Sequence, residues 1–244
     1  MTITLLLNGL NNRGTSTLSA YLYKLIKEGE HQKQDFKFCI NDSRKIAKSL
    51  VAFANTDGGK LLVGVKDNGK IAGIRTDEEF YMVEAAAKIY SKPPINFSIQ
   101  QWQVEGRTVL EIQIEPSTKK PHYAKSDEGK WLAYVRVHDE NILAHKIQLN
   151  VWQKNSSQIG IHFTYSESEK TLIEYLQDNA DISFSKFFKI AHISRRKAEE
   201  VLTNCVIMDI VKMETEKDGT LFSLNKMFDE RVLKEFENVK QPKF

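Results

Sequence analysis

The chain has 244 residues, of which 41% are hydrophobic and 27% charged, an ordinary composition for a globular protein with room for two domains. Its formal net charge of +3 is only mildly basic, so total charge alone does not predict nucleic-acid binding. The two cysteines, Cys39 and Cys205, match neither a metal-ligand spacing nor a disulfide framework, and no segment approaches the ~20 apolar residues of a membrane helix. We therefore expect a cytoplasmic protein with no membrane partner.

Basic residues are unevenly distributed along the chain. Residues 1–165 hold 22 Lys and Arg against 17 Asp and Glu, whereas residues 166–244 hold 13 against 15. Because neither part is strongly basic, any nucleic-acid binding must depend on local basic patches.

The first two thirds of the chain alternate between helical and extended patterns. Apolar residues at helical spacing predict helices over residues 18–27, 42–54 and 77–90. Alternating or apolar runs predict strands at residues 35–40, 60–65, 70–74, 95–104, 108–115 and 131–137. The second helix ends at Asn55, whose side chain can cap the turn, and at Gly58-Gly59, where glycine tolerates positive φ. Asp67-Asn68-Gly69 is a hairpin-turn sequence.

The last third of the chain has a different character. Residues 151–165 have a weak pattern and are interpreted as a linker, and Ser166 with Glu169 then forms a capping-box pattern before an amphipathic helix. Two further helices and two strands are predicted over residues 183–191, 194–207, 209–214 and 220–224. Three helices followed by a hairpin is the order of a winged helix-turn-helix domain, which we assign to residues 166–230, with a tail at residues 231–244.

The last of these helices begins with three basic residues. In a winged helix this element enters the major groove with its first residues facing the bases. Arg195, Arg196 and Lys197 could therefore reach phosphates or guanine edges. The alternative is a dimerisation or protein-contact module, which the slightly acidic charge of this part favours. Cations at a helix start also oppose the helix dipole, so another interaction must compensate for them.

A glycine-rich segment near the N-terminus has part of the pattern of a nucleotide-binding loop. Residues 9–16 have the glycine spacing of a phosphate-binding loop, but Thr15 stands where that loop needs its lysine. ATP binding is therefore not expected.

A small set of acidic residues lies at the predicted strand ends. Glu30 and Asp35 flank the start of the first strand, Asp67 follows the strand after the double glycine, and Lys37 lies two residues beyond Asp35. Such carboxylates could hold a divalent metal and position a water against a phosphate. The simpler interpretation is that Asp67 is a turn residue and Glu30 is solvated.

Four segments of the chain resemble the Schlafen-type AlbA domain. They are Gly29-Glu30, Asp35-Phe36-Lys37, the stretch AFANTDGG at residues 52–59 and the stretch LVGVKDNGKIAG at residues 62–73. The resemblance runs from about residue 23 to residue 145 and includes Lys120-Pro121-His122-Tyr123 and Tyr134-Val135-Arg136. It implies an α+β fold, with a mixed-sheet AlbA-like domain at residues 23–150 after an N-terminal extension of residues 1–22. Bacterial members, often described as DNA-binding or divergent-ATPase proteins, commonly carry a C-terminal winged helix.

The resemblance also implies roles for the acidic set. Animal Schlafen nucleases bind metal through three acids, and Glu30, Asp35 and Asp67 match those positions. The family usually has Glu where this chain has Asp35, and the shorter side chain withdraws the ligand by about one methylene from a site that needs metal–oxygen distances near ~2.1 Å. Animal enzymes pair two such lobes to grip RNA, so this chain would need to form a homodimer to build a similar groove.

Three functions follow from these observations. The first is a nucleic-acid-binding protein, a bacterial transcriptional regulator whose AlbA-like domain binds nucleic acid or dimerises while the winged helix contacts DNA in preference to RNA. Its expected phosphate contacts are Lys37, Arg136, Arg195, Arg196 and Lys197. The second is a metal-dependent endonuclease that uses Mg²⁺ or Mn²⁺ at Glu30, Asp35 and Asp67, and the third is a protein-interaction adaptor. Apart from that conditional metal, no cofactor is implied.

Overall fold

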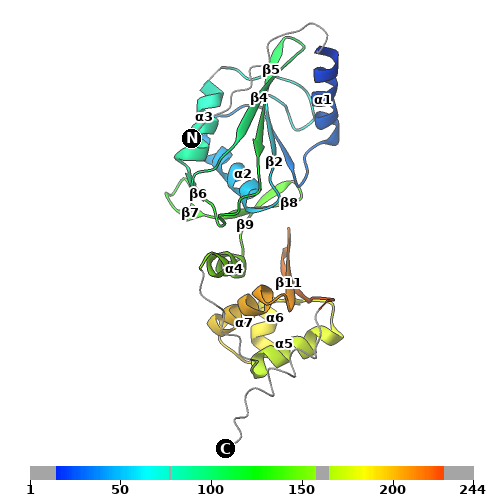
Figure 1. Ribbon diagram of the computed structural model, residues 1–244, viewed down its shortest axis with the longest axis vertical. Helices are drawn as coiled ribbons and strands as arrows, with labels where there is room; N and C mark the ends of the chain where they lie inside the picture. Colours follow the sequence, from blue (N-terminus) through cyan, green and yellow to red (C-terminus); the bar gives the residue numbers. More distant parts are fainter. Residues whose placement is uncertain (1–14, 77, 158–164, 228–244) are drawn as a thin grey trace, which may run out of the picture. The chain divides into compact units, whose positions relative to one another are not determined.

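The chain divides into two compact units, Met1–Ala144 and His145–Phe244. The computed structural model describes residues 15–76, 78–157 and 165–227. The N-terminal unit combines helices with a mixed sheet, and the C-terminal unit combines helices with a small sheet, so the expected α+β fold class is confirmed (Figure 1).

Three helices and nine strands are described in the N-terminal unit. The helices are α1 (Thr15–Glu28), α2 (Ser43–Asn55) and α3 (Glu78–Lys88). The strands are β1 (Gln34–Lys37), β2 (Gly59–Val63), β3 (Ser91–Lys92), β4 (Ser98–Val104), β5 (Arg107–Ile114), β6 (Tyr123–Lys125), β7 (Trp131–Leu132), β8 (Tyr134–Val137) and β9 (Glu140–Leu143).

The main sheet has the strand order β1-β2-β5-β4. β1 pairs with β2 in parallel, whereas β2 with β5 and β5 with β4 are antiparallel, so the expected mixed sheet is confirmed. Two neighbouring parallel strands need a crossover connection, and α2 supplies it.

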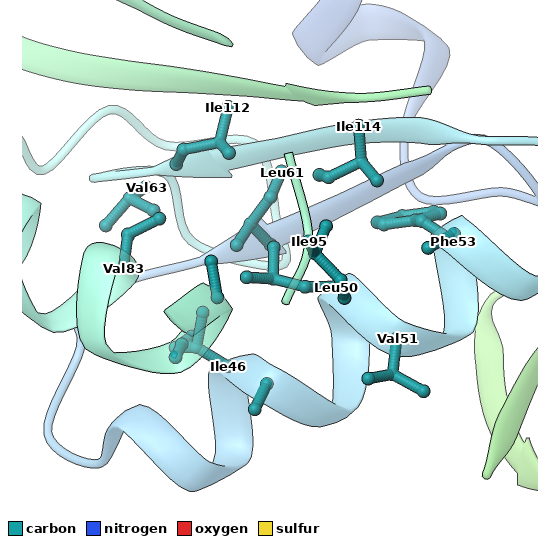
Figure 2. Packing of buried hydrophobic residues seen from close by; sticks show 14 of the residues in the cluster. Ile46, Leu50, Val51, Phe53, Leu61, Val63, Val83, Ile95, Ile112 and Ile114 are labelled. Carbon is teal, nitrogen blue, oxygen red and sulfur yellow. The ribbon is translucent and has the colours of Figure 1, made fainter. Parts of the chain in front are cut away.

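Helices cover both faces of this sheet, with α1 on one side and α2 and α3 on the other (Figure 1). Successive side chains of a strand point to opposite faces, so Leu61 and Val63 of β2 face α2 and α3, while Leu62 faces α1. Figure 2 shows the larger of the two cores, where side chains of α2, such as Leu50, pack toward β2 and β5.

The start of the chain differs from the expected extension of residues 1–22. Its described part, from Thr15, belongs to α1, and Leu22 is fully buried with Leu25 against the sheet. The apolar stripe of α1 covers the second face of the sheet, which would otherwise be exposed to water. Residues 1–14, with most of the glycine-rich segment, lie outside the described residues.

The link from α2 to β2 depends on its two glycines. Gly58 has a φ of +70°, and a Cβ atom there would lie 2.6 Å from the carbonyl oxygen of Ile114. A Cβ atom on Gly59 would lie 2.5 Å from the ring of Phe53. The helix can therefore pass directly into the strand only because neither residue has a side chain.

Asn55, the last residue of α2, does not cap the turn as expected. Its buried amide nitrogen donates to the carbonyl oxygens of His122 and Tyr134, each at 2.9 Å, and its amide oxygen accepts from the backbone N–H of His122 at 2.8 Å. Thr56 instead closes the helix, since its N–H donates to the carbonyl oxygen of Phe53. Asn55 therefore joins α2 to β8 and to the segment before β6.

The C-terminal unit contains four described helices and one three-stranded sheet. The elements are α4 (Lys146–Ser156), α5 (Glu167–Asp178), β10 (Ile182–Ser183), α6 (Phe184–Ile190), α7 (Arg195–Ile207), β11 (Val211–Glu216) and β12 (Gly219–Leu224). The strand order is β10-β12-β11, with antiparallel pairing throughout. The expected capping box at Ser166 and Glu169 is present. In the described part of the chain, no helix has the length and apolar character that crossing a membrane requires.

Helix α4 corrects part of the expected linker. Residues 151–156 are helical, because Ile147 and Val151 are buried in the same core as Leu172, Phe187 and Leu202. Lys154 also donates to the side-chain oxygen of Asn204 on α7 at 2.8 Å. The sequence pattern was too short to reveal this helix, whose buried face carries few residues.

Candidate functional site

The first candidate site surrounds Asp35 in β1. Asp35 is only 3% exposed, and its carboxylate lies 2.9 Å from the ammonium of Lys37 and 3.5 Å from the guanidinium of Arg136. It also accepts a hydrogen bond of 3.1 Å from the hydroxyl of Ser49 on α2. Two cations and one hydroxyl thus satisfy this buried carboxylate.

Glu30 lies beside Asp35, just before β1. Its Oε1 atom accepts from the backbone N–H of Phe36 at 2.8 Å. Burial raises the pKa of the Glu30 carboxyl above its ordinary value, and Asp35 adds to the rise through a side-chain hydrogen bond and its charge, while the Phe36 N–H opposes it.

Arg136 of β8 is buried rather than available to a nucleic-acid phosphate. The residue is 2% exposed, and its guanidinium donates to the carbonyl oxygen of Gln34 at 3.0 Å and to the side-chain oxygen of Asn141 at 3.1 Å. The same group lies 5.1 Å from the ring centre of Phe53. The expected phosphate contact does not fit this position, because the guanidinium instead ties β8 to β1 and α2. Lys37, another expected contact, is half-buried and engaged with Asp35.

Asp67 lies apart from the other two acids. It is exposed in the turn closed by the bond from the Gly69 N–H to the Lys66 carbonyl oxygen at 2.7 Å. Across residues 15–76, 78–157 and 165–227, no group of three or more His, Cys, Asp or Glu side chains is placed to hold a metal ion. The structure thus brings Glu30 and Asp35 together without Asp67, and the residues as placed do not fit the metal set that the resemblance implied.

The second candidate site is the start of α7 in the C-terminal unit. Ser194 caps this helix, since its hydroxyl accepts from the backbone N–H of Lys197 at 3.2 Å. Arg195 and Arg196 are exposed, and the Arg195 guanidinium lies 5.2 Å from the ring centre of Phe188 on α6. Lys197 is partly buried and pairs with Glu200 at 3.4 Å. The cation–π contact and the ion pair offset the unfavourable position of these cations at a helix start.

Two further lysines lie on the preceding helix and were not singled out from the sequence. Lys186 and Lys189 are exposed on α6, the helix that precedes α7 and packs against it. The Lys186 ammonium lies 4.8 Å from the ring centre of Tyr175. The signal was available in the sequence, because α6 contains two lysines and no acidic residue.

Comparison with known proteins identifies a domain that makes up most of the first unit. The family model described as Schlafen, AlbA_2 matches residues 30–145. This segment of the chain is therefore a Schlafen AlbA_2 domain, as the resemblance indicated. No match was found among curated proteins.

Two solved structures show similarity to the chain. One is the DIP2311 protein from Corynebacterium diphtheriae, with 18% identity and a TM-score of 0.44 over 84% of this chain and 38% of that one. The other is the N-terminal domain of a RecG-related protein from Nitrosomonas europaea, with 19% identity and a TM-score of 0.37 over 59% of this chain and 97% of that one. This chain thus spans well under half the length of the DIP2311 protein.

Proposed function

We propose that this protein is a cytoplasmic DNA-binding transcriptional regulator, in which residues 166–227 form a winged helix that places the start of α7 in the major groove. The observation that carries the proposal is the pair of exposed arginines, Arg195 and Arg196, in the first turn of α7. Arginine binds phosphate and guanine edges through two parallel hydrogen bonds, so this position suits DNA contact.

The order of elements supports a winged helix. Helices α6 and α7 are joined by a short turn in which His192 has a φ of +50°, and the β11–β12 hairpin follows directly. The hairpin turns at Lys217-Asp218-Gly219 and supplies the wing. In such domains the second helix of the helix-turn-helix pair enters the groove with its N-terminal residues facing the bases.

The charges of the C-terminal unit are segregated by helix, although residues 166–244 as a whole are slightly acidic. Helix α5 contains four acidic residues, Glu167, Glu169, Glu174 and Asp178, and one lysine, Lys170. In contrast, α6 and the first turn of α7 contain five cations, Lys186, Lys189, Arg195, Arg196 and Lys197, and no acidic residue. A local basic patch of this kind is sufficient for phosphate contacts even where the total charge is not basic.

A duplex with a wide major groove is the target that fits best. The B-form groove admits an α-helix, whereas the A-form groove of double-stranded RNA is too narrow for side chains to reach the bases. A homodimer would place two copies of α7 on half-sites about 34 Å apart, so we expect palindromic sites and a dimer in light scattering.

The proposal is tested by measuring binding to labelled duplex DNA by fluorescence anisotropy. The double variant Arg195→Ala and Arg196→Ala should lose at least about 1.4 kcal/mol of binding free energy, a tenfold change in affinity. The control is Lys170→Ala with Lys226→Ala, two exposed lysines of the same unit, which should bind as the parent does. Equal affinity of the arginine variant and the parent would refute the proposal.

A further inference from the structure

We infer that the Schlafen AlbA_2 unit has a phosphate-binding pocket of its own, between the start of α2 and the β6–β7 hairpin, which holds a backbone phosphate of the bound nucleic acid. The inference rests on the proposed nucleic-acid binding and adds a second contact surface to it. The pocket has a volume of about 130 Å³ and is lined by Arg44, Lys45, Lys48, Ala124, Lys125, Ser126, Asp127 and Tyr134. Helix α2 packs against β6, and Figure 1 shows the two side by side.

The lining of this pocket is strongly cationic. Four of its eight residues are basic and only Asp127 is acidic. Asp127 and the nearby Asp42 both engage the same cation, since each carboxylate lies 3.3 Å from the Nε atom of Arg44. In the described part of the chain, Lys45, Lys48 and Lys125 form no ion pair of 4.0 Å or less with an acidic side chain. The pocket therefore carries an excess positive charge that attracts an anion.

Tyr134 holds one of these lysines in place. The Lys48 ammonium lies 4.9 Å from the ring centre of Tyr134, a cation–π distance. A tyrosine phenol is uncharged at neutral pH, and burial raises the pKa of the Tyr134 phenol further, so the ring adds no negative charge to the pocket. A lysine already ordered over a ring loses less side-chain entropy when an anion binds.

The chemistry of the lining selects a phosphate group. Excess positive charge excludes metal cations, and three lysines together with a serine hydroxyl offer several hydrogen-bond donors to a tetrahedral oxyanion. Lysine acts as a mobile point charge rather than a planar fork, so the contact requires no particular base. The pocket thus suits the sugar–phosphate backbone and contributes affinity without sequence preference.

The test uses the full chain with Lys45→Ala and Lys48→Ala, and measures duplex DNA binding at several salt concentrations. Loss of one phosphate contact should reduce the slope of log K against log salt by ~0.9, equally for unrelated sequences. The matched control is Lys24→Ala with Lys27→Ala, two exposed lysines with the same spacing on α1, which should leave the slope unchanged. Thermal unfolding checks that all variants are folded.

A second measurement separates failure of the pocket from failure of the proposed function. Backbone amide NMR shifts of Lys125, Ser126 and Asp127 are followed as inorganic phosphate is added, with chloride as the control. Shifts in the parent that disappear in the Lys45→Ala, Lys48→Ala variant support the pocket, even if duplex DNA does not bind. In that case a free phosphate compound is the source of the phosphate. An unchanged salt slope in that variant, while the arginine variant of α7 loses affinity, overturns the inference that the pocket holds a phosphate of the nucleic acid and leaves the proposed function intact. Absence of both the slope change and the shifts also overturns it.

Discussion

Replacing Arg136 with alanine should destabilise the N-terminal unit, which contains the AlbA_2 domain, severely. Its side chain is 1% exposed, and the substitution removes an ion pair with Asp35, the donors to the carbonyl oxygen of Gln34 and to Asn141, and a cation–π contact with Phe53. Removing one partner of a buried pair costs about 3–5 kcal/mol, because the remaining polar groups stay desolvated. Lys37 still neutralises Asp35, which places the expected loss near the lower end of that range.

Urea unfolding followed by circular dichroism measures this loss. The control is Arg75→Ala, which removes an exposed arginine whose guanidinium lies 5.2 Å from the ring centre of Phe38. Exposed cation–π contacts contribute only about 0.5–1 kcal/mol, so the two arginines should differ several-fold. A loss below about 1 kcal/mol for Arg136→Ala would show that the buried network is not a major source of stability and would refute the reasoning.

Three further outcomes are expected. The Glu30 carboxyl has a raised pKa in the folded state, so the folded protein holds a proton that the unfolded chain has lost. The free energy of unfolding should therefore fall as pH rises from the ordinary pKa of Glu30 through its raised pKa, and Glu30→Gln should flatten this dependence in urea titrations. Gly59→Ala should lower the free energy of unfolding by about 1–3 kcal/mol, because the new methyl group meets the ring of Phe53; a Tm equal to that of the parent would contradict this. Burial also raises the pKa of the fully buried Cys205 thiol, so a thiol reagent should label the partly exposed Cys39 in native protein and reach Cys205 only on unfolding.

Much of the N-terminal unit could be predicted from the sequence. The apolar face of α2, the double glycine after it and the strand beginning at Gly59 are local signals, and each appears in the structure at nearly the expected residues. The strand expected at residues 70–74 is reduced to a single bridge between Val65 and Ile71. The N–H groups of Ala72 and Gly73 both donate to the carbonyl oxygen of Gly64, and the N–H of Ile74 donates to Thr108, so no regular ladder continues. Local periodicity thus locates elements better than it measures how far strands pair.

The candidate sites could be predicted only in part, because the surroundings of their residues depend on the fold. Arg136 was expected to contact a phosphate, but alternation along a strand does not reveal whether neighbouring elements cover that side chain. Asp67 was grouped with Glu30 by motif position, whereas a metal site depends on distances that only the fold supplies. Lys45 and Lys48 look like ordinary solvated helix lysines, and only the approach of β6 and its following turn creates a pocket around them.

The hydrogen bonds of Asn55 bear on how the N-terminal unit unfolds. Its amide nitrogen donates to residues 67 and 79 positions further along the chain, so one side chain links three segments that are far apart in sequence. Asn55→Asp would keep the shape but turn two donors into acceptors that face the carbonyl oxygens of His122 and Tyr134. Loss of these hydrogen bonds would release the end of α2, the segment before β6 and β8 together. In hydrogen exchange, the amides of these three segments should therefore behave as one cooperative unit.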